Sequence, residues 1–390
     1  MRDVVHQQQW PGDSIRGMTP RPLYLHVGAS KTGTSALQHG LFDSVGELAD
    51  RGVGVPLASR NAHIRQVLRP LGWVTASGFT REIRSERVAD LGSVLKAAAG
   101  ERLLLTCEDL CEADTERIEA LVEVADRAGQ EVRVVLTVRG LASVIPSEWQ
   151  QFLKHRMTLD YPTFLTRIQN RQGRWAGHFW RRQDLVAMCD RWTEVVGRDR
   201  IDVVITPDRA ADPEGLYRMF GQVVGFDPHQ LSWPERNVNA SWGYVEAEVY
   251  RRANEALGDR LPRYERDYQP GLRWPLVQGV LPRSASARIP LPPSELEWVT
   301  HVAREHVAWL QDANIRVHGD PASLIPSAAD TAELPRLDEE AVARASIETL
   351  ANFAVFAHRR GQRAAAEAPA TGVAGTARRV ARGVRRRLRG

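Results

Sequence analysis

The stretch from Leu23 to Gln38, L-Y-L-H-V-G-A-S-K-T-G-T-S-A-L-Q, limits what this chain of 390 residues can fold into more than any other part of it. An apolar run as long as a buried strand leads into a turn rich in glycine and hydroxyl side chains, and a segment with helical periodicity follows. Such a turn directs backbone N–H groups and the Lys31 ammonium at the start of a helix, where the helix dipole also favours an anion. The stretch therefore predicts a strand, a phosphate-binding turn and a helix, in that order.

The order of residues in this turn differs from that of a Walker A loop, which ends in Gly-Lys followed by Ser or Thr. Here Lys31 precedes Gly33, and the order is K-T-G-T-S. A glycine-rich turn can also serve only to make a tight connection between a strand and a helix. The lysine argues against that purely structural role, because a buried ammonium needs an anion as its partner.

Strands and helices are expected to alternate along the first 225 residues. Such alternation is typical of βαβ units with a parallel sheet, whose ligands bind at the carboxyl ends of the strands. We therefore predict an α/β fold, a P-loop-like three-layer αβα arrangement around a mainly parallel central sheet, with a C-terminal helical extension. Strands are expected at 21–27, 52–56, 102–106, 130–138 and 200–206, and helices at 34–42, 81–99, 115–128, 144–155, 184–196 and 213–224.

The alternation ends after about residue 225, which divides the chain into four expected parts. Residues 1–20 are expected to be a flexible leader, and residues 21–225 the α/β core. Residues 226–360 are rich in Pro, Trp and Arg at their start and then predict helices at 244–257, 294–313 and 338–359. We interpret them as a mainly helical extension or cap that completes the core, followed by a flexible basic tail at 361–390.

Composition points to a cytoplasmic protein. No apolar stretch approaches the roughly 18 residues needed to span a bilayer, and the N-terminal residues lack the apolar core of a signal peptide. The chain has three cysteines without a framework spacing, which favours a reducing compartment. Cys107 and Cys111 are spaced C-x3-C, with Cys189 far away and no clustered histidines, so no metal is expected.

The positive charge of the chain is concentrated at its end. The net charge is +4, yet residues 368–390 contain seven arginines and no acidic residue. The rest of the chain is therefore close to neutral, which argues against a nucleic-acid partner. Val380, Val384 and Leu388 form a thin apolar stripe among these arginines. Peripheral contact with the inner surface of a membrane and a solvated basic tail both fit this pattern.

A second pattern lies in the segment T-V-R-G-L-A-S-V-I-P-S-E-W-Q-Q, residues 137–151. Arg139 leaves the end of a strongly predicted strand, and Ser147 follows eight residues later in the next helix. An arginine fork with a hydroxyl is suited to a phosphate dianion. Taken alone, the two residues could equally be a surface arginine and an ordinary helical serine.

The two patterns together resemble the 5′-phosphosulfate and 3′-phosphate sites of bacterial sulfotransferases that use 3′-phosphoadenosine 5′-phosphosulfate (PAPS). The resemblance extends from residue 22 to about 240. It includes Thr106-Cys107-Glu108 at a strand end, the E-W-Q-Q helix and the segment R-N-V-N-A-S-W at 236–242. The remaining 150 residues show no resemblance. A PAPS-dependent sulfotransferase acting on a hydroxyl acceptor is the implied function, with PAPS as co-substrate and no metal.

The resemblance also implies roles for individual residues. Ser147, besides binding the 3′-phosphate with Arg139, would hold Lys31 away from the bridging oxygen until an acceptor arrives. Lys31 would neutralise charge on the departing phosphate. Trp149, next to Ser147, is a candidate for the wall of the adenine pocket. The residues implied to hold the 5′-phosphosulfate are Ser30, Lys31, Thr32, Gly33, Thr34 and Ser35.

A general base must accept the proton of the acceptor hydroxyl. Glu108 is the first candidate, because it follows a predicted strand and precedes Arg139 by 31 residues. His63, in N-A-H-I-R after the second predicted strand, is the rival. A structural role is the alternative for each, as a helix cap or ion-pair partner for Glu108 and as a core-edge side chain for His63.

Two other functions remain open at this point. A P-loop kinase-like phosphotransferase would use the same turn for ATP and could bind Mg²⁺ through Glu108 and Asp109. A non-catalytic, membrane-associated nucleotide-binding protein would bind the donor without turnover. The sequence predicts neither the acceptor, which could be a carbohydrate, a lipid-linked group or a small molecule, nor the oligomeric state.

Overall fold

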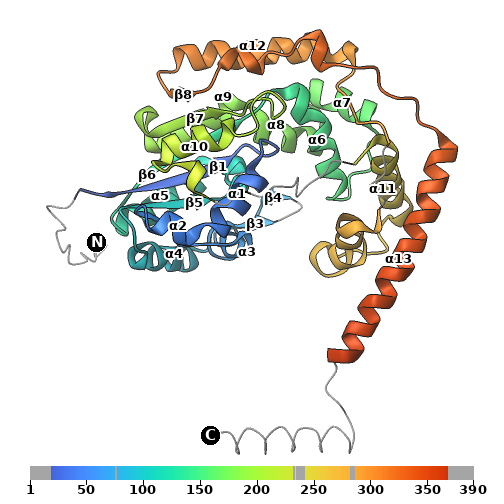
Figure 1. Ribbon diagram of the computed structural model, residues 1–390, viewed down its shortest axis with the longest axis horizontal. Helices are drawn as coiled ribbons and strands as arrows, with labels where there is room; N and C mark the ends of the chain where they lie inside the picture. Colours follow the sequence, from blue (N-terminus) through green and yellow to red (C-terminus); the bar gives the residue numbers. More distant parts are fainter. Residues whose placement is uncertain (1–18, 75–76, 232, 234–241, 282–285, 368–390) are drawn as a thin grey trace, which may run out of the picture. The chain divides into compact units, whose positions relative to one another are not determined.

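The computed structural model describes residues 19–74, 77–231, 233, 242–281 and 286–367 (Figure 1). The predicted leader up to residue 18, the tail from residue 368 and most of the segment 236–242 lie outside these residues. The chain divides into two compact units. The first, here the sheet unit, lies within 1–148, 165–240 and 291–332, and the second, the helical unit, within 149–164, 241–290 and 333–390.

Six parallel strands form the central sheet of the sheet unit, in the order β2-β5-β1-β6-β7-β8. Strand β1 lies in the interior, with Leu25 opposite Leu105 of β5 on one side and Val134 of β6 on the other. The carboxyl ends of β5, β1 and β6 therefore lie side by side at one edge of the sheet. The strands are β1 (Arg21–Gly28), β2 (Val53–Gly54), β5 (Arg102–Thr106), β6 (Gln130–Val138), β7 (Ile201–Ile205) and β8 (Arg316–His318).

Alternate residues of these strands enter two separate apolar clusters, as the pleat of a strand requires. Leu103, Leu105 and Val134 belong to a cluster with α4, α5, α9 and α12. Leu104 and Val135 belong to a second cluster with α1, α2 and α10. Helices thus cover both faces of the sheet, which gives the three layers predicted from the sequence (Figure 1).

Most of the longer helices of the sheet unit agree broadly with the predicted ranges. They are α1 (Thr34–Asp43), α4 (Ser85–Ala97), α5 (Thr115–Arg127), α6 (Leu141–Leu153), α9 (Leu185–Val196), α10 (Gly215–Val224) and α12 (Leu296–Asp312). Helices α2 (Val45–Ala49), α3 (Arg60–His63), α7 (Tyr161–Gln169) and α8 (Gly173–Gln183) were not predicted. Short elements complete it: η1 (Ile64–Leu68), β3 (Trp73–Val74), β4 (Gly78–Phe79), η2 (Glu108–Glu112), η3 (Arg198–Arg200), η4 (Pro228–Gln230), η7 (Pro293–Glu295), η8 (Pro321–Leu324) and η9 (Ala328–Asp330).

One strand of the sheet unit was not predicted either. Strand β8 comes from the region expected to be mainly helical, and it pairs with β7 at the edge of the sheet. Arg316 and His318 of β8 bind the Asp202 carboxylate of β7, at 2.8 Å from Arg316 Nη2 and 2.8 Å from His318 Nε2. Helices α7 and α8 were also missed, and α8 proves important for the candidate site.

The helical unit contains α11 (Tyr244–Leu257), two π-helical segments, η5 (Tyr264–Arg273) and η6 (Leu276–Val280), and the long α13 (Glu339–Glu367). The Asn254 side chain of α11 donates to the carbonyls of Leu153 and Met157, at 2.8 and 3.0 Å. It also accepts a 2.7 Å hydrogen bond from the Tyr268 hydroxyl of η5. These bonds tie together three segments that are distant in sequence. Across the described residues, no helix is both long and apolar enough to cross a bilayer.

Candidate functional site

The predicted turn connects β1 to α1 at the carboxyl edge of the sheet. Gly28 ends β1 with φ of 101°, and a Cβ at this position would lie 2.8 Å from the backbone oxygen of Glu108. Glycine therefore permits the turn and the segment after β5 to approach closely. Lys31 adopts a left-handed conformation with φ of 66°, and Gly33, with φ of 90°, is the N-cap residue of α1. Gly33 has no side chain with which to cap the first-turn N–H groups.

The side chain of Thr32 connects the turn to strand β6 of the sheet. Its buried hydroxyl donates to the Ala29 carbonyl at 2.7 Å and lies 2.7 Å from the Thr137 hydroxyl of β6. The His26 ring of β1 continues this network, with Nδ1 2.8 Å from the Thr106 hydroxyl and Nε2 3.1 Å from that of Thr137. Burial lowers the pKa of His26 to about 4, so the ring is neutral at physiological pH. The Thr32 hydroxyl thus makes its hydrogen bonds to groups of the protein itself.

Glu108 contacts the turn from the neighbouring strand β5. Its carboxylate accepts a hydrogen bond from the Thr34 hydroxyl and lies 3.4 Å from Arg60 Nη2. The side chain is 11% exposed, whereas that of Arg60 is about half exposed. Burial alone would raise the pKa of Glu108, but Arg60, the Thr34 hydroxyl, Arg182 and Lys31 together hold it below the usual value. Glu108 is therefore ionised at neutral pH.

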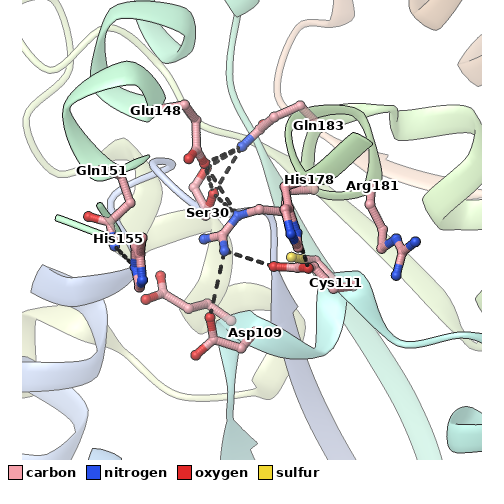
Figure 2. A network of polar contacts seen from close by, with 12 residues as sticks. Ser30, Asp109, Cys111, Glu148, Gln151, His155, His178, Arg181 and Gln183 are labelled. Atoms are coloured by element: carbon pink, nitrogen blue, oxygen red, sulfur yellow. Dashed lines mark hydrogen bonds and ion pairs between the residues drawn. The ribbon is translucent and has the colours of Figure 1, made fainter. Parts of the chain in front are cut away.

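Glu148 contacts the turn from α6. Its carboxylate is fully buried and accepts hydrogen bonds from the Ser30 hydroxyl and from Gln183 Nε2, the latter at 2.9 Å (Figure 2). Gln183 also donates to the Ser30 carbonyl at 3.1 Å. In the described part of the chain, the second carboxylate oxygen of Glu148 has no hydrogen-bond donor. A buried anion therefore lies directly against the first residues of the turn.

Arg182, the residue before Gln183 in α8, is the central cation of this network. Its Nη1 lies 2.9 Å from the Glu112 carboxylate and 3.9 Å from Asp109, and its Nε lies 3.5 Å from Glu148. The same Nε donates to the Ser30 hydroxyl at 3.1 Å. Three carboxylates thus share one guanidinium that is only 11% exposed. Burial raises the pKa of Asp109 to about 6, and Arg60 opposes this shift.

Lys31 lies in the electric field of two of these carboxylates. Burial lowers the pKa of its ammonium, while the nearby charges of Glu148 and Glu108 raise it. Arg182 and Arg60 act in the opposite direction. The structure thus brings the lysine of the turn together with the predicted Glu108. It adds Glu148, Arg182 and Gln183, none of which was assigned a role from the sequence.

Arg139 and Ser147 follow β6, the strand on the other side of β1. Arg139 lines a cavity of about 20 Å³, whose described lining residues include Ala29 and Gln183 but not Lys31. This volume holds a single water molecule. The Ser147 hydroxyl donates to the Ser143 carbonyl one turn earlier in α6, at 3.3 Å. The two residues predicted to bind the 3′-phosphate thus follow β6, the strand next to β1, and the cavity beside Arg139 is small.

The polar atoms of two predicted site residues, His63 and Trp149, contact backbone groups outside the turn. The His63 ring is buried, with Nδ1 2.9 Å from the Ser59 carbonyl and Nε2 3.4 Å from the Thr106 backbone N–H, which donates to it. Burial also lowers the pKa of His63. Trp149 is fully buried in the helical unit, where its indole N–H donates to the Leu159 carbonyl at 3.0 Å. Both ring nitrogens of His63 thus contact backbone groups, whereas Glu108 contacts the turn itself.

The acidic residues of the site have arginine partners. Arg60 lies 3.4 Å from Glu108 and 3.8 Å from Asp109, the two carboxylates considered for Mg²⁺. Within the described ranges, no group of three or more His, Cys, Asp or Glu side chains is arranged to hold a metal ion. Glu108 and Asp109 are thus both close to the Arg60 guanidinium.

No family model matches the sequence, and no curated protein matches it. Among solved structures, the fold is similar to that of a sulfotransferase from Alicyclobacillus acidocaldarius. The two share 17% sequence identity with a TM-score of 0.39, over 62% of this chain and 95% of that one.

Proposed function

We propose that the protein is a sulfotransferase that moves the sulfuryl group of PAPS to a hydroxyl acceptor. The observation that carries the proposal is the turn at Ser30–Ser35. It sets the Lys31 ammonium at the uncapped start of α1, beside the ionised carboxylate of Glu108. A helix start with a lysine is suited to a phosphate-like anion, and a carboxylate next to it is suited to accept a proton.

The donor would be held at both of its phosphate groups. The first-turn amides of α1 and the hydroxyls of Thr34 and Ser35 would bind the 5′-phosphosulfate, with Lys31 as the cation. Arg139 and Ser147 would bind the 3′-phosphate. Parallel pairing of β1 with β6 supports this division, because it brings the residues that follow both strands to one edge of the sheet. Donor binding would require the small cavity beside Arg139 to open.

Sulfuryl transfer is an in-line displacement at sulfur. The acceptor oxygen forms a bond to sulfur while the bond from sulfur to the bridging oxygen breaks, and its electron pair stays on the departing 5′-phosphate. Lys31 would stabilise the charge that develops on this oxygen. Glu108 would take the acceptor proton, since its lowered pKa keeps it ionised at neutral pH.

Free thiols are consistent with the cytoplasmic location expected from the sequence. Cys107, Cys111 and Cys189 are all buried and unbridged. The acceptor class remains a carbohydrate, a lipid-linked group or a small molecule bearing a hydroxyl.

Ligand-induced stabilisation against heat tests the proposal directly. The product nucleotide 3′-phosphoadenosine 5′-phosphate, at about 100 times its dissociation constant, should stabilise the protein by about 2.7 kcal/mol. ATP with Mg²⁺ at the same concentration should stabilise it less. Lys31→Ala should reduce the stabilisation, whereas Lys96→Ala, on the exposed side of α4, should not. Greater stabilisation by ATP with Mg²⁺ would contradict the proposal.

A further inference from the structure

The polar network around the turn contains more carboxylates than cationic side chains. Its cations are the Lys31 ammonium and the guanidiniums of Arg60 and Arg182. Four carboxylates lie within 4 Å of one of these two guanidiniums, namely those of Glu108, Asp109, Glu112 and Glu148. The proposed binding site for an anion therefore sets four negative charges against three positive ones.

Asp109, in η2, is held less closely than the other three carboxylates. Its oxygens lie 3.8 Å from Arg60 Nη2 and 3.9 Å from Arg182 Nη1, both longer than a hydrogen bond, and its side chain is only 8% exposed. By contrast, each of the other three carboxylates accepts at least one hydrogen bond. Burial raises the pKa of Asp109 to about 6, helped by the charges of Glu108 and Glu112 and opposed by the two arginines. Asp109 is therefore the carboxylate that we expect to respond first to an added negative charge.

Titratable groups near Asp109 also come from its own segment and from α8. The thiols of Cys107 and Cys111 are buried, which raises their pKa and keeps them neutral. His178 of α8 contacts Glu112, with Nδ1 3.4 Å from the carboxylate. His178 is therefore the alternative proton acceptor in this network.

A phosphosulfate bound at the turn would add negative charge beside this network. Arg182 connects the two, because its Nε donates to the Ser30 hydroxyl at 3.1 Å while its Nη1 lies 3.9 Å from Asp109 (Figure 2). Two unit charges about 10 Å apart near a protein surface change each other's protonation equilibrium by about tenfold. The phosphosulfate would also take the Thr34 hydroxyl from Glu108. A new anion at the turn therefore favours protonation of the carboxylate that is held least closely.

We propose that Asp109 takes up a proton from solvent when a phosphosulfate nucleotide binds at Ser30–Ser35, so that lower pH strengthens nucleotide binding. The proton adds to a carboxylate oxygen of Asp109 and returns to solvent when the nucleotide leaves. With Asp109 neutral, Arg60 and Arg182 face one negative charge fewer, which leaves more of their positive charge for the nucleotide. The inference rests on the proposed function, because it requires an anion at the turn.

Calorimetric titration of the full-length protein with adenosine 5′-phosphosulfate tests this inference, because the phosphosulfate group does not titrate near neutral pH. Titrations in buffers of different ionisation enthalpy give the number of protons taken up. A tenfold change in the protonation equilibrium of Asp109 predicts an uptake of about 0.4 proton per nucleotide at pH 7. The nucleotide should also bind about fivefold more tightly at pH 6 than at pH 8.

Three variants assign the proton to a residue. Asp109→Asn should take up no proton and should bind the nucleotide equally at both pH values. Glu116→Gln, at an exposed acidic position of α5, is the matched control and should behave like the parent. His178→Gln should retain the uptake. If Asp109→Asn fails to fold, the titrations of the parent and of His178→Gln decide the question.

Three results would overturn the inference. Nucleotide binding by the parent without proton uptake, or uptake that persists in Asp109→Asn, would do so and leave the proposed function standing. Uptake that disappears in His178→Gln would assign the proton to His178 instead. No binding of adenosine 5′-phosphosulfate would also overturn it, and stabilisation by 3′-phosphoadenosine 5′-phosphate would then show whether the proposed function fails with it.

Discussion

Replacing Arg182 by methionine should destabilise the protein strongly. Three carboxylates, those of Glu112, Asp109 and Glu148, lie within 4 Å of this guanidinium, which is 11% exposed. Methionine fills a similar volume but leaves those buried charges without their shared cation. Breaking a buried ion pair on one side costs about 3–5 kcal/mol, so a loss of this size in the free energy of unfolding is expected.

Urea unfolding at pH 7 measures this loss, and the neighbouring residue provides the control. Arg181 is exposed, and Figure 2 shows its side chain pointing away from the network. Arg181→Met should therefore change the free energy of unfolding by less than about 0.5 kcal/mol. Glu148→Gln should cost about 1–3 kcal/mol, less than Arg182→Met, because Arg182 keeps its closest partner, Glu112.

The pH dependence of the difference in unfolding free energy between the parent and Arg182→Met provides a second test. In the parent, burial alone would raise the pKa of Glu112, but His178 and Arg182 hold it below the usual value. This carboxylate thus stabilises the fold above its unfolded pKa, and the contribution is lost as pH falls. Without Arg182, only His178 opposes the effect of burial, so the folded pKa of Glu112 should rise and the folded variant should bind more protons than the folded parent as pH falls. The deficit of Arg182→Met should therefore shrink from pH 7 to pH 5. A loss below 1 kcal/mol, or a deficit independent of pH, would refute this reasoning.

Four further predictions concern the proposed reaction. Lys31→Ala should lower kcat by about 10²–10³-fold, more than it weakens donor binding, as steady-state kinetics would reveal. Arg139→Ala should weaken calorimetric binding of 3′-phosphoadenosine 5′-phosphate by about tenfold or more, but leave adenosine 5′-phosphosulfate, which lacks the 3′-phosphate, unaffected. Glu108→Gln should abolish acceptor-dependent turnover, whereas His63→Ala should mainly lower the melting temperature; the reverse would assign the base to His63. In the parent, the fall of kcat/KM on the acid side should come at a lower pH than an ordinary glutamate would give, since Arg60 and the Thr34 hydroxyl outweigh burial and lower the pKa of Glu108.

Local sequence patterns predicted those elements whose residues are buried on both faces of the sheet. The strands at 102–106 and 130–138 have the predicted bounds, because each is an apolar run between polar turns. Strand β8 has only three residues, R-V-H, and none is fully buried. It is stabilised by its bonds to Asp202, which lies 114 residues away from Arg316. Such a strand has no local signal of its own.

The candidate site shows the same division between local and long-range information. The turn could be predicted because its glycines, lysine and hydroxyls are adjacent in sequence. The residues that hold it come from other segments, since Glu148 and Gln183 follow Ser30 by 118 and 153 residues. The E-W-Q-Q segment was a signal for Glu148, but nothing near Gln183 indicated that α8 would reach the turn. His63 was the rival of Glu108 for the role of base, and the contacts of both its ring nitrogens with backbone groups come from the fold and could not be predicted from N-A-H-I-R.

Binding of the proposed donor at this turn would be an exchange of anions. The hydroxyls of Ser30 and Thr34 donate to the carboxylates of Glu148 and Glu108, and both carboxylates act on the Lys31 ammonium. A buried lysine without any anion would lose its proton or destabilise the fold. Glu148 and Glu108 therefore oppose the lowering of the Lys31 pKa that burial causes. A phosphosulfate can displace them only if it offers the hydroxyls and the ammonium better geometry than they do, which favours a dianionic group over a single carboxylate.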